Sequence, residues 1–265
     1  MFYDFEGNYG IWDGENSSGK LLSFEKIRAA NDLSLLTQIK KAHDETCIDV
    51  MIGQMWSNYI SVEALGKVRS FGIPIINIAM DDRLPHHWLR KGSVRLGSIG
   101  LWPSVDIVLT TCADVCDWYG MEGCPAIFWP LASDPKLYGP TPDVKRDIDV
   151  LFIGNCYGVR NEIVSYLQNH GINVDCYGTG WPNGYVNAEE MIHLSKRAKI
   201  ILGIGTVGYT SDVYTLKLRD FDALMTGALY ITHRNKDLTQ IFIEGQEIEC
   251  YNSNNEVYKK IHYYL

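Results

Sequence analysis

The chain has 265 residues, of which 46% are hydrophobic and 12% aromatic, and it carries a formal net charge of −8. This composition excludes disordered and fibrous classes, because the chain can bury a large apolar core. Neither half of the chain is basic, so no surface for nucleic acid is predicted, although a few cations at helix N-termini can still bind one diphosphate.

The cysteines indicate a reducing environment. There are seven, an odd number, and they are scattered along the chain, which together with the lack of an apolar signal segment predicts a cytoplasmic protein. The tightest group, Cys112, Cys116 and Cys124, lacks the paired spacing of a zinc site, so no metal or cofactor is predicted. No apolar run reaches the ~20 residues that span a bilayer.

Short apolar runs alternate with amphipathic segments along the chain. The expected strands are 48–53, 73–80, 106–110, 126–129, 149–153, 173–177, 199–202, 228–232 and 247–250. The expected helices are 23–43, 61–70, 113–119, 159–170, 188–197, 215–226 and 256–263. Because most of these strands are nearly continuous in Val, Ile and Leu, the pattern predicts an α/β protein with parallel sheets and helices on both faces.

A proline-rich stretch interrupts this alternation. Four prolines lie within residues 130–142, and they disfavour regular structure. The favoured interpretation is a hinge between two domains, residues 1–135 and 146–265, and the alternative is one long loop in a single sheet. The amino-terminal half has fewer strands than a full Rossmann domain, which leaves open an incomplete domain or a module of a longer polypeptide.

One candidate anion site follows the expected strand 149–153. The chain continues through Gly154 and Asn155 into a helix whose first turn contains Arg160. This order aims backbone N–H groups and a helix N-terminus at whatever lies beyond the strand. The alternative is a simple strand-to-helix turn in which Gly154 serves tight geometry.

A second candidate is the G-x-G-x-x-G sequence from Gly203 to Gly208. A dinucleotide fingerprint leads directly into a helix, but four polar or aromatic residues (209–212) intervene here. No acidic residue for an adenosine ribose follows the next strand. A glycine-rich loop lining a ligand cleft, with Gly205 in it, is therefore favoured over a nicotinamide site.

A third candidate is the expected helix 215–226. Lys217 and Arg219 lie near its start, where cations conflict with the helix dipole unless an anion is bound. The alternative is a pair of solvated surface cations.

Three segments together resemble the GT-B glycosyltransferases of the CgeB/YkvP spore-protein-like group, which are related to glycosyltransferase group 1 and family 4. "LKLRDFDALMTGALYIT" (216–232) resembles the signature K-P-R-x-F-E-x-x-A-x-G-A-x-x-x-T. The segment 149–181, from "DVLFIGN" to "YGTGW", resembles the opening of the donor domain, and "WPLASDPKLYGP" (129–140) resembles the interdomain phrase. The resemblance covers residues 126–265 well, with a weaker echo in "GIPIINIAMDDR" (72–83).

The resemblance implies a GT-B fold of two Rossmann-like domains and donor-site roles for particular residues. Gly154, Asn155 and Arg160 match the diphosphate-facing loop, and Lys217 and Arg219 match the basic pair of the signature.

Two positions depart from the family pattern. Asp222 stands where the family has a Glu that binds the ribose hydroxyls, and the Asp side chain is shorter by one methylene. Tyr214 replaces the first Glu of the family 4 E-x7-E pair, which weakens the case for a retaining mechanism.

Candidates for activating the acceptor lie in "MDDRLPHHW" after the expected strand 73–80: Asp81, Asp82, His86 and His87. The carboxyl ends of parallel strands are where such sheets place ligands, and a carboxylate there could deprotonate a hydroxyl. The alternative is that the two Asp residues cap a helix and that the His pair lies at the surface.

The expected function is metal-independent transfer of a sugar from a UDP- or GDP-sugar to a glycan or another hydroxyl-bearing acceptor. A non-catalytic nucleotide- or sugar-binding module is the first alternative, and an NADP-linked reductase that uses residues 203–208 is the second.

Overall fold

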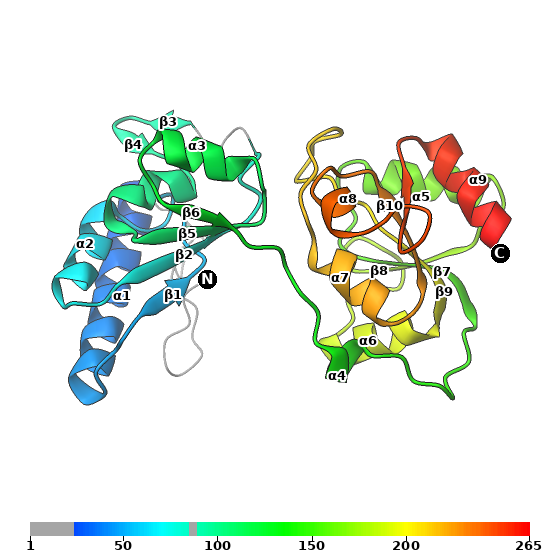
Figure 1. Ribbon diagram of the computed structural model, residues 1–265, viewed down its shortest axis with the longest axis horizontal. Coiled ribbons are helices and arrows are strands. Elements are labelled where there is room, and N and C mark those ends of the chain that lie inside the picture. The colour runs from blue at the N-terminus through cyan, green and yellow to red at the C-terminus, as the bar shows by residue number, and fades with distance from the viewer. Residues whose placement is uncertain (1–23, 85–88) are drawn as a thin grey trace. The chain divides into compact units, whose positions relative to one another are not determined.

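The computed structural model describes residues 24–84 and 89–265, and the chain divides into two compact units, residues 1–129 and 130–265 (Figure 1). Each unit contains its own parallel sheet. The prediction of an α/β protein with two largely parallel sheets is therefore confirmed, and the alternative of one continuous sheet is wrong. The division lies at the start of the proline-rich stretch.

The sheet of the first unit has four parallel strands in the order β1-β2-β5-β6. They are β1 (Met51–Gly53), β2 (Ile75–Ala79), β5 (Ile107–Thr110) and β6 (Ala126–Phe128). Because this order advances in one direction, right-handed connections pass over the same face of the sheet each time. The described connections of this unit therefore lie on one face of the sheet, whereas helices on both faces were predicted.

The helices that connect the strands of the first unit pack on the sheet and enclose its apolar core. They are α2 (Val62–Ser70), the 3-10 helix η2 (Ser98–Ser104) and α3 (Val115–Met121), and α1 (Phe24–Glu45) packs on α2. Leu65, Ile75 and Val108 are fully buried among them. A small antiparallel pair, β3 (Arg90–Lys91) with β4 (Val94–Arg95), was not predicted, because two-residue strands leave no periodic pattern.

The sheet of the second unit has five parallel strands in the order β11-β10-β9-β7-β8. They are β7 (Ile148–Ile153), β8 (Val174–Tyr177), β9 (Ala198–Leu202), β10 (Leu229–His233) and β11 (Glu249–Tyr251). Val150, Phe152, Ile200 and Ile231 are almost completely buried, as the continuous apolar runs predicted.

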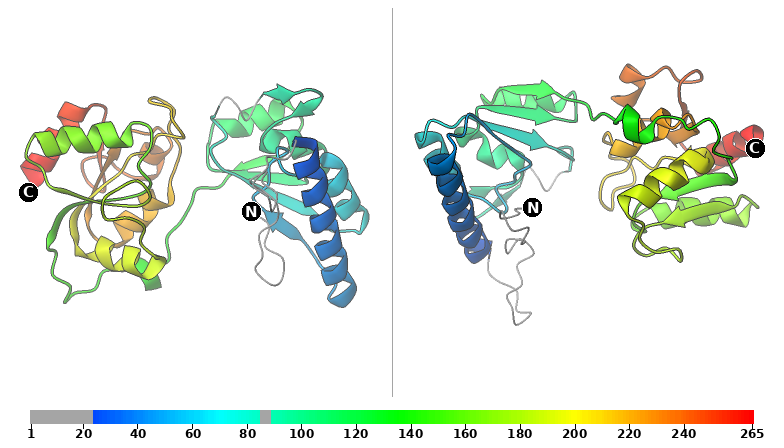
Figure 2. Two further views of the ribbon diagram at one scale, coloured as in Figure 1. Left: turned by 180° about the vertical axis from the view of Figure 1, so that it is seen from behind. Right: turned by 90° about the horizontal axis from the view of Figure 1, so that it is seen from below.

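Helices cover both faces of this second sheet, as predicted. They are α5 (Arg160–Asn169), α6 (Ala188–Arg197), α7 (Leu218–Met225), the short α8 (Leu238–Ile241) and α9 (Asn254–Tyr264). α5 packs against α9 on one face, and α6 lies on the other (Figure 2). The face with α6 and α7 carries the largest cluster of predicted site residues.

The proline-rich stretch contains a short helix that the sequence analysis did not predict. α4 (Pro135–Tyr138) contacts both α6 and α7. Pro135 occupies the first helical turn, where a missing N–H costs nothing, and the Asp134 side chain accepts a 2.8 Å hydrogen bond from the backbone N–H of Lys136. α4 thus brings Tyr138 to the α6–α7 face.

Among the described residues, no helix is long and apolar enough to cross a membrane.

Candidate functional site

The order in which the chain adds strands to the second sheet reverses at β7. From β7 the chain goes outward to β8 and then returns past β7 to β9. In open parallel sheets, ligands bind beyond the carboxyl ends of the strands at such a reversal point. Ile153 ends β7, and the predicted loop with Gly154 and Asn155 follows it directly.

Four hydrogen bonds hold the Gly154 loop against the loop after β8. The N–H of Gly154 donates to Tyr177 O and the N–H of Cys156 to Thr179 O, both at 2.8 Å. In addition, the side-chain oxygen of Asn155 accepts from the N–H of Thr179 at 3.1 Å, and the indole of Trp181 donates to Gly154 O at 2.7 Å. The N–H groups of Gly154 and Cys156 are thus used within the protein, which differs from the expectation that they face a ligand.

Two guanidinium groups converge on Gly154 instead. A Cβ atom built at this glycine would lie 2.8 Å from Arg219 Nη2 and 3.3 Å from Arg160 Nη1. A side chain here would therefore displace one of the two cations, and the backbone has a φ of 156°, which L residues rarely adopt. Both the close approach and the backbone conformation require glycine at this position.

Aromatic rings and backbone carbonyls fix the two guanidinium groups in place. The Cζ atom of Arg219 lies 4.9 Å from the centre of the Phe152 ring, and that of Arg160 lies 4.0 Å from the centre of the Tyr157 ring. Arg219 Nε donates to Ile153 O at 3.1 Å, and Arg160 Nη1 donates to Asn155 O at 2.8 Å. Two like charges held this close create a strongly positive point that favours an anion.

The start of α7 differs from its predicted position. The helix begins at Leu218, and Lys217 is its N-cap residue with extended backbone (φ −123°, ψ 151°). Asp220 causes this start, because its carboxylate accepts a 2.7 Å hydrogen bond from the N–H of Lys217. Lys217 therefore precedes the first helical turn, whereas Arg219 lies in that turn as expected.

Asp220 is a buried carboxylate that the sequence analysis did not single out. It is 2% exposed, and its Oδ1 accepts a 2.5 Å hydrogen bond from the hydroxyl of Tyr230. Burial raises the pKa of Asp220, while the bonds from Tyr230 and Lys217 oppose this change. The residue fixes the start of α7 from inside the protein.

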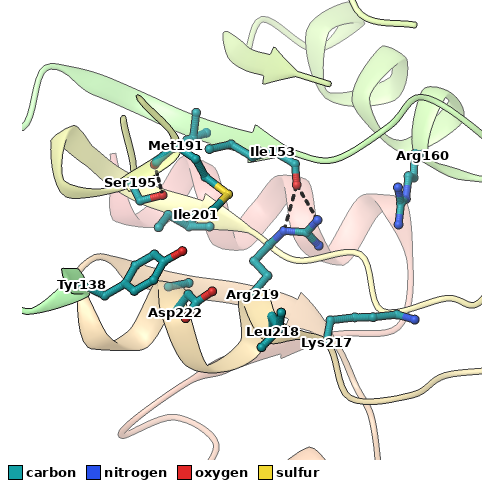
Figure 3. Close-up of a pocket in the computed structure, with 12 residues that line it drawn as sticks. Tyr138, Ile153, Arg160, Met191, Ser195, Ile201, Lys217, Leu218, Arg219 and Asp222 are labelled. Carbon is teal, nitrogen blue, oxygen red and sulfur yellow. Dashed lines mark hydrogen bonds between the residues drawn. The ribbon is translucent and has the colours of Figure 1, made fainter. Parts of the chain in front are cut away.

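A cavity of about 290 Å³ extends from the two arginines between α6 and α7 (Figure 3). Its lining includes Arg160, Lys217, Arg219, Asp222, Tyr138 and Ser195, with Met191 and Ile201 among the apolar members. In Figure 3, Asp222 and Tyr138 lie at one end, Arg160 and Lys217 lie at the other, and Arg219 lies between them.

Asp222 is half-buried at the end of this cavity where Tyr138 lies. Burial raises the pKa of its carboxyl, and interactions with Ser133, Tyr138 and the charge of Arg219 oppose the increase. Tyr138 was missed by the sequence analysis, which treated its proline-rich surroundings as a hinge. Its position after Asp134-Pro135, the start signal of α4, was the feature that could have indicated it.

The glycine-rich loop 203–208 is built into the protein rather than placed in the cavity. Gly205 is buried, and its N–H donates to His233 Nδ1 at 3.3 Å. Burial lowers the pKa of His233 to about 4, so its ring is neutral near pH 7. No helix follows the glycines until α7, so the context of a dinucleotide fingerprint is absent here. Gly205 does not line the cavity.

The predicted acceptor-side residues belong to the first unit. Asp82 is 1% exposed, and its Oδ2 accepts from the Thr110 hydroxyl at 3.0 Å and from the Tyr119 hydroxyl at 3.3 Å. Burial raises the pKa of Asp82 to about 7. Asp81 has a φ of 60°, a strained value for a residue other than glycine. His86 and His87 lie outside the described residues.

In the described part of the chain, no group of three or more His, Cys, Asp or Glu side chains could hold a metal ion. All seven cysteines are free thiols.

Comparison with known proteins agrees with this architecture. Residues 160–265 match the family described as "Glycosyl transferase-like". The solved structures that are similar to the chain include two glycosyltransferases. AviGT4, a glycosyltransferase involved in avilamycin A biosynthesis, is 15% identical with a TM-score of 0.51, over 86% of this chain and 68% of that one. An alpha-glucosyltransferase in complex with UDP-glucose and DNA containing an abasic site is 11% identical with a TM-score of 0.57, over 94% of this chain and 77% of that one.

No curated protein matches the chain. At such low identities the similar structures show the fold alone. Residues 160–265 thus match a glycosyl transferase-like domain, and the chain has the two-sheet α/β fold of GT-B glycosyltransferase structures.

Proposed function

We propose that the protein is a glycosyltransferase of the CgeB/YkvP-like group that transfers a sugar from a UDP- or GDP-sugar to a glycan or another hydroxyl-bearing acceptor. The convergence of Arg160 and Arg219 on Gly154 carries this proposal. A diphosphate suits two fixed guanidinium groups, because each can donate two hydrogen bonds to its oxygens.

The donor would bind on the second unit. Its diphosphate would lie on Arg160 and Arg219 with Lys217 beside them, and its ribose would lie at Asp222, which shares the cavity with all three. The similarity to a structure that contains UDP-glucose supports a nucleotide sugar as the ligand. Asn155 and Gly205 would act indirectly, Asn155 through its bond to Thr179 and Gly205 through its bond to His233.

The same cations would assist the chemistry without a metal ion. When the bond from the sugar to the diphosphate breaks, negative charge grows on the leaving phosphate. Guanidinium groups already fixed by Phe152, Tyr157 and backbone carbonyls stabilise that charge without having to reorganise. This is the role that a bound metal has in other transferases.

The acceptor would bind on the first unit, at the carboxyl end of β2. Asp82 is the favoured base there, because a carboxyl with a pKa of about 7 can accept a proton from a hydroxyl near neutral pH. Asp81 and His86 remain further candidates. The free thiols support a cytoplasmic location for this activity.

One alternative is a module that binds the same ligand but catalyses no reaction. Asp82 is enclosed by Thr110 and Tyr119, and Tyr214 replaces a family glutamate, which would suit a nucleotide- or sugar-binding module. Hydrolysis of the donor to free sugar and nucleoside diphosphate, measured with and without candidate acceptors, separates an enzyme from such a module.

Thermal unfolding in the presence of UDP, GDP, CMP and NADP⁺ tests the donor class, since a ligand that binds the folded state raises its melting temperature. The proposal predicts a higher melting temperature with UDP or GDP. An increase with NADP⁺ that exceeds both of them contradicts the proposal and favours the reductase.

A further inference from the structure

Two tyrosines stand beside the arginine pair on the second unit. Tyr157 belongs to the loop after β7, and Tyr209 belongs to the loop after β9. Their ring centroids are 5.6 Å apart at an interplanar angle of 56°. Tyr209 is 84% exposed, so this pair presents an aromatic surface to solvent directly next to the cations.

Close backbone contact fixes the two loops against each other. A Cβ atom built at Gly158 would lie 3.1 Å from Gly208 O and 3.5 Å from the Cα of Tyr209. Both glycines have positive φ, 57° and 56°, so each loop turns sharply at the contact. The position of Tyr209 is therefore set by the fold rather than by its exposed ring.

The aromatic pair lies at the end of a continuous row of contacts. Tyr209 contacts Tyr157, and Tyr157 lies under the guanidinium of Arg160. The guanidinium groups of Arg160 and Arg219 both lie against the ring of Phe152, which extends the row from Arg160 to Arg219. Asp222 follows Arg219 by three residues on α7, which places it about one turn further along the cavity. The row therefore runs from an aromatic pair through two cations to a carboxylate.

A nucleotide sugar has its chemical groups in the same order. The sugar is joined to the diphosphate, and the diphosphate is joined to the ribose. With the diphosphate on the arginines and the ribose at Asp222, the sugar extends from the opposite side of the cations, toward Tyr157 and Tyr209.

We infer that Tyr157 and Tyr209 form a platform that binds the ring of the sugar to be transferred, an inference that rests on the proposed function. One face of a pyranose ring presents C–H groups, and the negative face of a phenol ring attracts them. A base could also stack on such a platform, but the ribose would then lie between the tyrosines and the arginines, away from Asp222, which matches the ribose-binding Glu of the family.

The test compares each nucleoside diphosphate with its sugar form. Calorimetry gives the Kd of UDP, UDP-glucose, UDP-N-acetylglucosamine, GDP and GDP-mannose for the wild type, Tyr209→Ala and Tyr209→Phe. The control is Tyr185→Ala, since Tyr185 is likewise exposed (78%) in the same unit but belongs to the loop between β8 and α6, outside the row of contacts. The readout is the Kd of the sugar nucleotide divided by the Kd of its nucleoside diphosphate, for the pair that the wild type binds most tightly.

For Tyr209→Ala, we expect binding of the sugar nucleotide to weaken about three- to tenfold, as the loss of an aromatic contact predicts, with the Kd of the diphosphate unchanged. Tyr209→Phe and Tyr185→Ala should retain the wild-type ratio. Equal weakening of both ligands would place the base on the platform, and unchanged Kd values for both ligands would show that the platform binds neither group. Either result overturns the inference and leaves the proposed function intact, whereas a wild type that binds none of the five ligands overturns both.

Discussion

The indole N–H of Trp181 donates a 2.7 Å hydrogen bond to the carbonyl oxygen of Gly154, the residue on which Arg160 and Arg219 converge. Trp181 also packs edge-on against Phe152, with ring centroids 6.0 Å apart. One side chain from the loop after β8 thus supports both the glycine and the ring that position the cations.

Trp181→Phe should remove the hydrogen bond and keep most of the ring packing. We expect the free energy of unfolding to fall by about 1 kcal/mol. Nucleotide affinity should also fall by a few fold, because the Gly154 loop loses one of the four hydrogen bonds that hold it. Urea unfolding and calorimetry with UDP measure the two effects. Trp118→Phe in the first unit is the control, and an equal loss of affinity in that variant would contradict the role of Trp181.

Asp222 provides a test of ribose recognition. Asp222→Asn keeps the size but removes the charge, so it should weaken binding of UDP more than binding of 2′-deoxy-UDP. Asp222→Glu should be tolerated or improve binding, because it restores the family residue. Tyr138→Phe is the matched control, since it removes a hydroxyl that faces Asp222 but leaves the carboxylate in place. If Asp222 serves only the packing of α4, UDP and its deoxy analogue will lose affinity equally.

The pH dependence of stability should carry the signature of Asp82. Its pKa is about 7 in the folded protein and 3.8 for an ordinary Asp, because burial disfavours the charged form. Between these values the folded state holds a proton that the unfolded chain has released, so the contribution of Asp82 to the free energy of unfolding falls as the pH rises.

Asp82→Asn lacks this titration. Relative to the wild type, its free energy of unfolding should therefore increase with pH across that window, by at most about 1.4 kcal/mol per pH unit. Urea unfolding at half-unit steps from pH 4 to pH 8 measures the difference, and parallel curves for the two proteins would refute the shifted pKa. Under the proposed function, the same variant should also lose sugar transfer.

Arg146 anchors the segment that leads into the second sheet. Its guanidinium donates to Ala198 O at 2.5 Å and to Thr226 O at 2.7 Å, and so joins the start of β9 to the end of α7. Arg146→Met should lower the free energy of unfolding by about 2–3 kcal/mol, because charged hydrogen bonds are lost and carbonyls are left unpaired. Arg197→Met, which removes an exposed ion pair with Asp147, should cost much less in the same urea titration.

The strands and main helices followed from the sequence because they depend on local patterns. The predicted strand 149–153 and the observed β7 (Ile148–Ile153) differ by one residue, since a buried parallel strand is a continuous apolar run. α4 was missed because four prolines outweigh a four-residue helix in any local interpretation, although Pro135 suits the first turn.

The site was only partly predictable. Arg160 and Arg219 could be singled out from their places near helix starts. Their meeting at Gly154 depends on a hydrogen bond from Arg219 to the carbonyl oxygen of Ile153, two residues that are 66 positions apart in the sequence. The start of α7 at Leu218 depends on Asp220, whose buried bond to Tyr230 has no local signal. The Trp181 bond likewise joins two loops that only the sheet order brings together.

The most direct test of the account is the affinity of Arg160→Met and Arg219→Met for UDP and for uridine, measured by calorimetry against Arg197→Met. If the two guanidinium groups bind the donor diphosphate, each site variant should lose at least about tenfold in affinity for UDP, as expected for a charged contact. Binding of uridine, which has no phosphate, should change little, and Arg197→Met should bind both ligands like the wild type. Equal affinities for UDP in all four proteins would contradict the central claim.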